Sequence, residues 1–221
     1  MKINLSGVTL IAVSSIEIDA TISALSKSYY GIDFDEVKFV THEKPNNLPK
    51  KIKFEKCPRL DNIIKYNRYM FKELWLHVQT SHCLVIQYDS WVLNPSKWDN
   101  DWLDYDYIGA PWLVRENSYL TDQDERIRVG NGGFSLRSKK LLEIPNKLGL
   151  SLEQRMGYWN EDGNICVYQR DKFLKEGTKY APIEVAARFS YESLMFENVG
   201  IKPFGFHKHL PQELRLRPTL I

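Results

Sequence analysis

Short apolar runs and longer stripes of apolar residues at helical spacing alternate along the first part of the chain. The runs are too short for isolated helices, and they predict buried strands at 8–13, 37–40, 52–54 and 83–86. The stripes predict a helix over 16–25 and, most clearly, another over 60–79. Strands that alternate with helices are typical of an α/β fold with a mostly parallel sheet and helices on both faces.

The second half of the chain continues with shorter elements of the same two kinds. We expect strands at 91–93, 108–112 and 134–136, helices at 139–144, 162–175 and 183–189, and a loop or edge strand in KPFGFHKH. In sheets of this kind, ligands bind beyond the carboxyl ends of the strands. Polar residues that directly follow an apolar run are therefore the first candidates for a site.

Gln87-Tyr88-Asp89 directly follows the apolar run 83–86. Strand alternation predicts that Gln87 and Asp89 share one face and that Tyr88 lies on the other. A carboxylate with a neighbouring oxygen ligand can bind a hard divalent cation, and such a cation can hold a diphosphate. A solvated aspartate that begins a turn explains the same residues, and spacing alone favours that alternative.

A glycine-rich stretch, VGNGGFSLRS, occupies residues 129–138. Asn131-Gly132 is a strong signal for a β-hairpin. Glycines at 130, 132 and 133 also allow the backbone to approach a ligand closely. The hairpin is slightly favoured, and the two interpretations are compatible.

Asn160-Glu161-Asp162 precedes the predicted helix 162–175. Asn160 suits the N-cap position, and carboxylates in a first turn are stabilised by the helix dipole. One carboxylate could instead act as a general base, with a pKa that the helix start holds low so that it is ionised at neutral pH.

His207 and His209 lie two residues apart, so in an extended segment their imidazoles face the same side. Imidazole is a common ligand of divalent transition metals. A surface histidine pair is the more frequent explanation of this spacing.

Asn67-Arg68 lies inside the apolar stripe of the helix predicted over 60–79. Asn67 is four residues after Ile63 and four before Phe71, so it faces the core and needs a polar partner. That partner is either backbone or a nucleotide at the sheet edge. Arg68 suits phosphate, and a solvated helix face suits it equally.

Bulk composition narrows the class of protein. The chain has 221 residues, 43% hydrophobic content, 26% charged content and a net charge of +2, so no global field recruits nucleic acid. Its three cysteines, Cys57, Cys83 and Cys166, form no CxxC motif, which favours a reducing compartment. The sequence contains no stretch long enough to span a bilayer, which suggests a cytoplasmic location. The apolar run 8–13 is interpreted as a strand and not as a signal peptide. Two arginines in the tail ELRLRPTLI leave peripheral contact with a membrane open.

The order of these motifs resembles the GT-A class of nucleotide-sugar glycosyltransferases. In particular IQYDSWVLNP, YDYIGAPW, VGNGGFSLRS and APIEVAARFSYE resemble a mainly bacterial family of glycosyltransferase-like domains with largely undefined substrates. The resemblance runs from about residue 66 to residue 207. It implies one GT-A-like domain over 1–221, with a nucleotide-binding half at 1–93 and an acceptor-side half at 94–221.

The resemblance implies a metal site for Mn²⁺ or Mg²⁺. Asp89 corresponds to the aspartate that touches the metal, and His207 corresponds to the class's C-terminal histidine ligand, with His209 in reserve. Gln87 stands where the class has a carboxylate, which lowers the charge of the site and its expected metal affinity. Val13 and Ser14, at the end of the first strand, are placed near the nucleotide base by position only.

The resemblance also implies catalytic roles in an inverting transfer. Asp162 would be the base that deprotonates the acceptor hydroxyl, and Glu161 would bind acceptor or sugar hydroxyls. Gly132 and Gly133 would approach the donor sugar or the acceptor. Asn67 and Arg68 would contact the nucleotide or its phosphates.

These roles describe an enzyme that uses a nucleotide-diphosphate sugar and a glycan or lipid-linked glycan acceptor, in surface glycan or polysaccharide synthesis, without nucleic acid. Two alternatives are a non-catalytic nucleotide-sugar or glycan-binding domain, which Gln87 favours, and a sugar nucleotidyltransferase, which the absence of a glycine-rich basic loop near residues 12–23 disfavours.

Six aromatic residues are candidates for stacking on sugar rings, although most aromatic side chains fill the core instead. They are Trp91, Trp98, Trp102, Tyr105, Tyr107 and Trp112.

Overall fold

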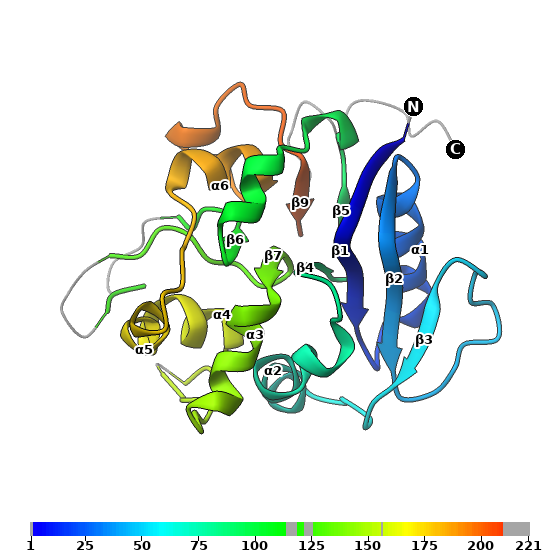
Figure 1. Ribbon diagram of the computed structural model, residues 1–221, viewed down its shortest axis with the longest axis horizontal. Helices are drawn as coiled ribbons and strands as arrows, with labels where there is room; N and C mark the ends of the chain where they lie inside the picture. Colours follow the sequence, from blue (N-terminus) through cyan, green and yellow to red (C-terminus); the bar gives the residue numbers. More distant parts are fainter. Residues whose placement is uncertain (1, 114–118, 122–125, 156, 210–221) are drawn as a thin grey trace.

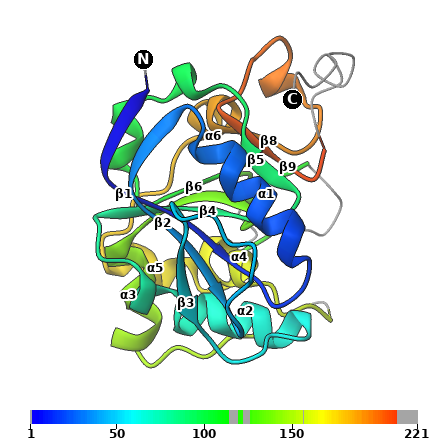
Figure 2. The same cartoon turned by 90° about the vertical axis from the view of Figure 1, so that its right-hand side faces the viewer.

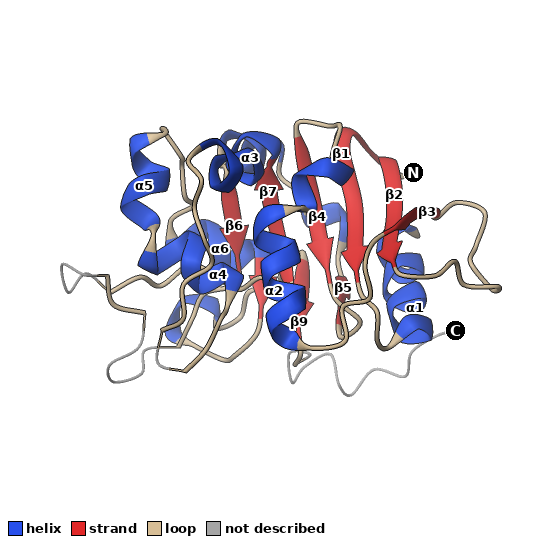
Figure 3. Cartoon of the chain, turned by 90° about the horizontal axis from the view of Figure 1, so that it is seen from below, coloured by secondary structure: helices blue, strands red, loops and turns tan. Residues whose placement is uncertain are grey.

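A six-stranded sheet forms the centre of the computed structural model, which describes residues 2–113, 119–121, 126–155 and 157–209 (Figure 1). The strand order is β3-β2-β1-β4-β7-β6. The strands are β1 (Ile3–Val13), β2 (Ile32–Thr41), β3 (Lys53–Lys56), β4 (His82–Ile86), β6 (Tyr107–Gly109) and β7 (Phe134–Ser138). Strands β3, β2, β1 and β4 are parallel, whereas β7 is antiparallel to both neighbours (Figure 3). The prediction of an α/β fold with a mostly parallel sheet is confirmed.

A second, three-stranded sheet joins distant parts of the chain. Its order is β5-β9-β8, with β5 at Ser90–Val92, β8 at Ser190–Tyr191 and β9 at Gly205–His207 (Figure 2). Because β9 is the middle strand of this sheet, the prediction of a loop or edge strand in KPFGFHKH is wrong. Ser90 pairs with His207 across β5 and β9, so this sheet carries the late histidine to the end of β4.

Helices cover both faces of the main sheet. They are α1 (Ile18–Tyr29), α2 (Ile63–Lys72), α3 (Lys139–Lys147), α4 (Glu161–Gly163), α5 (Arg170–Lys175) and α6 (Ile183–Phe189). Short 3₁₀ turns lie at Leu74–His77, Pro95–Lys97, Asn100–Asp104 and Phe196–Asn198, and a π turn lies at Asn164–Tyr168. Among the residues that the structure describes, no helix has the length and apolar content needed to cross a membrane.

The core has two halves because the central strands are apolar on both faces. Leu10 and Ala12 of β1 pack in the cluster that contains the apolar side of α1, whereas Ile11 and Val13 pack in the cluster that contains α2 and α3. Figure 2 shows the sheet between α1 and α2. This two-sided burial explains why the strands read as continuous apolar runs and not as an alternation.

Two predicted helices are interrupted in the structure. The stripe at 60–79 forms α2 and then the 3₁₀ turn Leu74–His77, and Asn62 caps α2 by accepting a hydrogen bond from the Lys65 N–H (2.9 Å). The stripe at 162–175 is divided by the π turn Asn164–Tyr168. Asn164 binds the carbonyl of Asn160 (2.9 Å) through its side chain, which competes with regular helix bonding.

The glycine-rich stretch is not a hairpin. The strand that follows it, β7, pairs with β4 and β6, and residue 129 forms its bridge with Pro111. Asn131 adopts a positive φ of 67°, as the Asn-Gly signal suggests, but the turn leads into the middle of the main sheet. The hairpin prediction is therefore wrong, and the stretch is a loop at the edge of the site.

We predict that Leu84→Ala lowers the free energy of unfolding by about 2–5 kcal/mol, because Leu84 is completely buried in β4 and truncation leaves a cavity. Denaturant unfolding measures the change. The matched control is Leu194→Ala, at a leucine that is 66% exposed, with an expected cost below about 0.5 kcal/mol. Equal costs at the two positions would contradict the placement of β4 in the core.

Candidate functional site

The candidate site begins where β4 ends. Because β4 ends at Ile86, Gln87, Tyr88 and Asp89 form a turn and all three line the same cavity. The expectation that Tyr88 faces away from its two neighbours is therefore wrong. Buried Ser90 holds this turn, since its hydroxyl accepts a hydrogen bond from the Gln87 N–H (2.8 Å) and donates one to the Gly133 carbonyl (2.7 Å). Ser90 thus joins the end of β4 to the glycine-rich loop.

His207 lies at the centre of the turn's polar side chains. Its Nε2 is 3.1 Å from Oε1 of Gln87 and 3.7 Å from Oδ1 of Asp89. On the other side of the ring, Nδ1 is 3.2 Å from Oε1 of Glu192. Oε1 of Gln87 can only accept, so its contact with Nε2 is a hydrogen bond when Nε2 carries a proton. A carboxylate that accepts the Nδ1 proton can also hold the ring in the other tautomer, in which Nε2 is free to bind a cation.

Glu192 and Asp89, the two carboxylates beside His207, show that the site suits positive charge. Burial alone would raise the pKa of Glu192, but its hydrogen bond to His207 and the positive charge of Lys208 hold that pKa below its ordinary value. Oδ1 of Asp89 is buried and has no hydrogen-bond partner among the described residues. A buried carboxylate oxygen without a partner is costly, and a cation is the ligand that it suits.

Glycine is required at two positions of the loop because other groups occupy the space of a side chain. A Cβ at Gly133 would lie 2.1 Å from Nε2 of His207. A Cβ at Gly132 would lie 2.3 Å from Oε1 of Glu161. The glycines thus let the histidine and the carboxylates approach the backbone.

Asp162 is held by two backbone donors and has a perturbed pKa. Its carboxylate accepts hydrogen bonds from the N–H groups of Gly132 (2.9 Å) and Gly163 (2.7 Å). Burial and the neighbouring Glu161 carboxylate raise its pKa to about 6, although both donors and Arg137 act in the opposite direction. The expectation of a low pKa at the helix start is wrong. Helix α4 has only three residues, and burial outweighs its dipole.

Arg137 was missed as a site residue by sequence reasoning. It is completely buried in β7, and its guanidinium donates to Glu161 (2.9 Å), to the Gly132 carbonyl (3.2 Å) and to Ser135 (2.9 Å). A charged residue beside Phe134 and Leu136 in a predicted strand was the available signal, because a fully buried arginine requires a charged partner.

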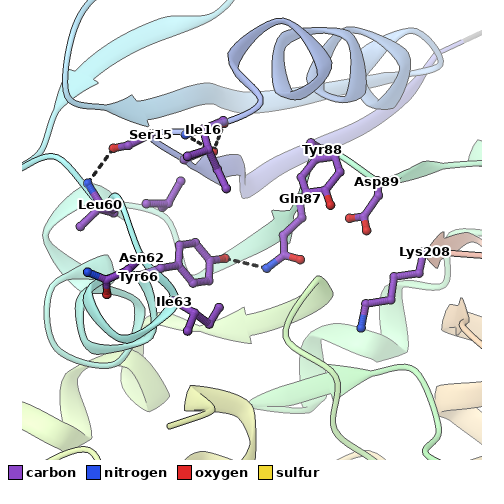
Figure 4. A pocket seen from close by; sticks show the side chains of 12 residues that line it. Ser15, Ile16, Leu60, Asn62, Ile63, Tyr66, Gln87, Tyr88, Asp89 and Lys208 are labelled. Carbon is purple, nitrogen blue, oxygen red and sulfur yellow. Dashed lines mark hydrogen bonds between the residues drawn. The ribbon is translucent and has the colours of Figure 1, made fainter. Parts of the chain in front are cut away.

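Two adjoining cavities open on this cluster. The first, of about 300 Å³, is lined by Val13, Ser14, Ser15, Ile16, Leu60, Asn62, Ile63, Tyr66, Gln87, Tyr88, Asp89 and Lys208. Figure 4 shows Ser15 and Leu60 on one side of it and Gln87, Asp89 and Lys208 on the other. Gln87 donates to the Tyr66 hydroxyl (2.9 Å), which leaves its carbonyl oxygen toward His207.

The second cavity, of about 310 Å³, is more polar. It is lined by Ile63, Tyr66, Asn67, Gln87, Trp112, Tyr119, Asn131, Gly132, Gly133, Asn160, Glu161, Asp162, Gly163, Tyr168, Glu192, His207 and Lys208. The cavities share Ile63, Tyr66, Gln87 and Lys208, so the cluster around His207 lies between them. Nδ2 of Asn67 is buried without a hydrogen-bond partner within the described residues, so it is available to donate to a ligand in this cavity.

Most of the expected site residues come together here. Val13, Ser14 and Asp89 line the first cavity, Gln87 lines both, and Asn67, Gly132, Gly133, Glu161, Asp162 and His207 line the second. Arg68 does not, because it lies in a groove on the other side of α2. His209 is exposed and lines neither cavity. The tail at 213–221 lies outside the described residues.

The aromatic residues divide between core and site. Trp102 and Tyr107 are completely buried, so at these two positions the alternative of a core role is confirmed. Trp112 lines the second cavity and stacks on Tyr119, with ring centroids 4.1 Å apart and an interplanar angle of 8°. This stacked pair therefore lies on the wall of the same cavity as Asp162.

A family model described as "Protein of unknown function (DUF5672)" matches residues 50–207. The chain belongs to this family. The match covers the end of β4, the glycine-rich loop, α4 and His207, so the whole cluster lies within the family's domain. A search of curated proteins finds no match.

Two solved structures are similar to this chain to different degrees. An active-site mutant of LgtC has a TM-score of 0.58 and 13% sequence identity, over 92% of this chain and 88% of that one. The mannosyltransferase PcManGT from Pyrobaculum calidifontis, in complex with GDP-Man and Mn²⁺, has a TM-score of 0.45 and 11% identity, over 79% of this chain and 53% of that one. The likeness to LgtC shows that the DUF5672 chain has a GT-A-like fold.

We predict that Arg137→Leu lowers the free energy of unfolding by about 3–5 kcal/mol, because it leaves Glu161 buried without its partner. The double variant Arg137→Leu/Glu161→Leu should recover much of that loss. Arg188→Leu is the control, since its ion pair with Asp99 (3.4 Å) is half-exposed and is worth below about 1 kcal/mol. Equal losses for Arg137→Leu and Arg188→Leu would contradict the buried pair.

The raised pKa of Asp162 predicts a pH-dependent effect of Asp162→Asn on stability. From about pH 4 to about pH 6 the folded protein binds the proton more strongly than the unfolded chain, so this group costs stability as pH rises through that window. Asparagine does not ionise. The gain in unfolding free energy of Asp162→Asn over wild type should therefore grow by roughly 1–3 kcal/mol from pH 4.5 to pH 7.5. A difference independent of pH in denaturant unfolding would refute the raised pKa.

Proposed function

We propose that this protein is a glycosyltransferase that moves a sugar from a nucleotide-diphosphate donor to a hydroxyl acceptor with the help of a divalent cation. The observation that carries the proposal is the convergence of Gln87, Asp89 and His207 between two cavities, at the carboxyl end of a GT-A-like sheet. Open α/β sheets bind their ligands at this edge.

The residues around His207 fit a divalent cation. Asp89 provides a buried oxygen without a hydrogen-bond partner, Gln87 provides an amide oxygen, and His207 provides a nitrogen whose tautomer Glu192 can fix. Oε1 of Gln87 and Oδ1 of Asp89 lie 3.1 and 3.7 Å from Nε2 of His207, so the three atoms would be close enough to hold one ion. Groups of three His, Cys, Asp or Glu side chains in a metal-binding arrangement are absent from the described residues.

With only two strong ligands and one amide, the site suits an ion whose remaining positions are filled by substrate phosphates, as is usual for Mg²⁺. Gln87 therefore weakens binding of the free ion without removing the site. Such an ion, when bound, supplies positive charge against the diphosphate leaving group. Lys208, which lines both cavities, adds a further positive charge beside it.

The two cavities suggest where the two halves of the donor lie. The first is more apolar, with Val13 and Ser14 at its wall, and is proposed for the nucleoside. The second carries carboxylates, amides and the stacked Trp112–Tyr119 pair, which are the groups that bind sugar hydroxyls and sugar faces. It is proposed for the donor sugar and the acceptor, with the amide of Asn67 as a donor to a hydroxyl.

Asp162 is proposed as the general base. A carboxylate with a pKa of about 6 is ionised at neutral pH and still basic enough to accept a proton from a hydroxyl in the transition state. The N–H groups of Gly132 and Gly163 hold it in place. As the acceptor oxygen bonds to the anomeric carbon, its proton passes to Asp162 and the bond to the nucleotide diphosphate breaks, with inversion.

Glu161 has a structural role in addition to the hydroxyl binding that was expected of it. Its Oε1 accepts the hydrogen bond from Arg137, so this residue positions the loop and Asp162. Binding of a substrate hydroxyl by its other oxygen stays a prediction. The proposed activity belongs to the chain as one GT-A-like domain, with 1–93 on the nucleotide side and 94–221 on the acceptor side.

Thermal unfolding tests the donor and cation site. In a panel of UDP, GDP, CMP and dTDP with and without Mn²⁺, we expect one nucleotide to raise the melting temperature only with Mn²⁺. At about a hundredfold its Kd the ligand adds about 2.7 kcal/mol of stability. Asp89→Asn should abolish that shift, because an amide does not replace the anionic ligand.

Asp104→Asn is the matched control, since Asp104 is exposed and lines neither cavity. A nucleotide shift that persists unchanged in Asp89→Asn would refute the cation site. A shift that needs no Mn²⁺ would favour a metal-independent transferase or a binding domain.

A further inference from the structure

The chain concentrates its positive charge in one segment. Residues 44–72 contain nine lysines and arginines and two acidic residues, a net charge of +7, whereas the other 192 residues contain 21 basic and 26 acidic residues. Although the whole chain is nearly neutral, this segment is strongly basic, and it comprises the loop 44–52, β3, α2 and the connection between β3 and α2. Asp33 and Glu36 pair with Lys51 and Lys53 near β3, so the remaining excess of positive charge lies toward the helix. A field of one sign over part of a surface attracts partners of the opposite sign.

The helix end of this segment forms a basic groove. Arg59, Lys65, Arg68 and Lys72 line a groove of about 380 Å³ together with Pro58, Leu60, Tyr69 and Glu73. Lys65 pairs with Asp61 (2.8 Å), and Lys72 donates to two backbone carbonyls. Arg59 and Arg68 are exposed and have neither an ion pair nor a hydrogen bond within the part of the chain that the structure describes.

Helix α2 places this groove beside the mouth of the candidate active site. One side of the helix, with Ile63, Tyr66 and Asn67, lines the two cavities around His207, whereas Lys65 and Arg68 lie on the groove side. Leu60 lines both the first cavity and the groove. A partner bound in the groove would therefore lie next to the cavity mouth.

Apolar side chains beside the cations decide which polyanion the surface fits. Ile63 is 65% exposed and Ile64 is 39% exposed at the start of α2. Aliphatic side chains flanked by lysines and arginines suit the interface of a bilayer with anionic headgroups. Single-stranded nucleic acid needs exposed aromatic rings, but Tyr69 of the groove is only 9% exposed and its hydroxyl is bonded to His77 (2.6 Å).

We propose that this surface, consisting of Arg59, Ile64, Lys65, Arg68 and Lys72, with Ile63 at its border with the cavities, docks on an anionic membrane through the lipid phosphates. Arg68 thus binds phosphate, but not that of the nucleotide. Docking holds the cavity mouth against the bilayer, where an acceptor carried by a lipid is presented. The membrane contact rests on the charge and exposure of α2 alone, and its consequence for the acceptor rests on the proposed transferase function.

Sedimentation of the full chain with vesicles tests the proposal without any nucleotide. We expect binding to phosphatidylcholine vesicles that contain roughly one-third phosphatidylglycerol, weak binding to phosphatidylcholine alone, and release at about 0.5 M salt. Arg59→Glu/Arg68→Glu should reduce the partition coefficient more than about tenfold, because each cation near the surface contributes severalfold. Arg59→Gln/Arg68→Gln should give a smaller loss in the same direction.

Lys97→Glu/Lys175→Glu is the matched control, because it makes the same change in net charge at exposed lysines on other elements and should bind as wild type does. Circular dichroism confirms that each variant is folded. Equal binding to neutral and anionic vesicles, or equal losses in both charge-reversal variants, would overturn the proposal. The proposal would also be overturned if the wild type bound a labelled single-stranded RNA but no vesicles, and if Arg59→Glu/Arg68→Glu abolished that RNA binding. Because no donor is present, failure here is distinct from failure of the transferase assignment.

Discussion

The buried ion pair between Arg137 and Glu161 is the contact on which the candidate site depends. Arg137 lies inside the main sheet on β7, where burial of a charge is expensive unless a partner of opposite charge is supplied. Its second bond, to the Gly132 carbonyl, ties the same guanidinium to the glycine-rich loop. One side chain thus fixes the loop and the start of α4 relative to the sheet.

From that pair the rest of the site follows by contact. Gly132 donates its N–H to Asp162, and Gly133 leaves space for the ring of His207. Ser90 ties the Gly133 carbonyl to the turn that carries Gln87 and Asp89. Hence the carboxylate proposed as the base and the groups proposed to hold the cation belong to one connected network, although residues 87 and 207 are 120 positions apart in the chain.

The parts of the structure that depend on local sequence could be predicted. The strands at 8–13, 37–40 and 83–86 are short, continuous apolar runs, and α2 has both a clear stripe and a cap at Asn62. Gln87 and Asp89 were found because a parallel strand delivers its carboxyl end to a ligand site. His207 and Asp162 depended on a resemblance in motif order, since spacing alone favoured less specific explanations.

The parts that depend on tertiary context could not. The pairing of β9 between β5 and β8 and the passage of the glycine-rich loop into β7 are choices of strand partner, which a turn signal such as Asn-Gly does not determine. The pKa of Asp162 depends on burial by distant elements, so its first-turn position suggested the wrong direction. The placement of Arg68 depended on which side of α2 faces the sheet edge. Adjacent residues of a helix point to different sides, so Asn67 faces the cavity and Arg68 faces the groove.

We propose that Asp162 and the residues around His207 act together in sugar transfer. The most direct test is release of nucleoside diphosphate from a panel of nucleotide sugars with Mn²⁺, for wild type and Asp162→Asn. We expect turnover by wild type and a loss of at least about a hundredfold in kcat for Asp162→Asn, with donor binding retained. Binding of a nucleotide sugar without turnover by wild type, or full turnover by Asp162→Asn, would contradict it.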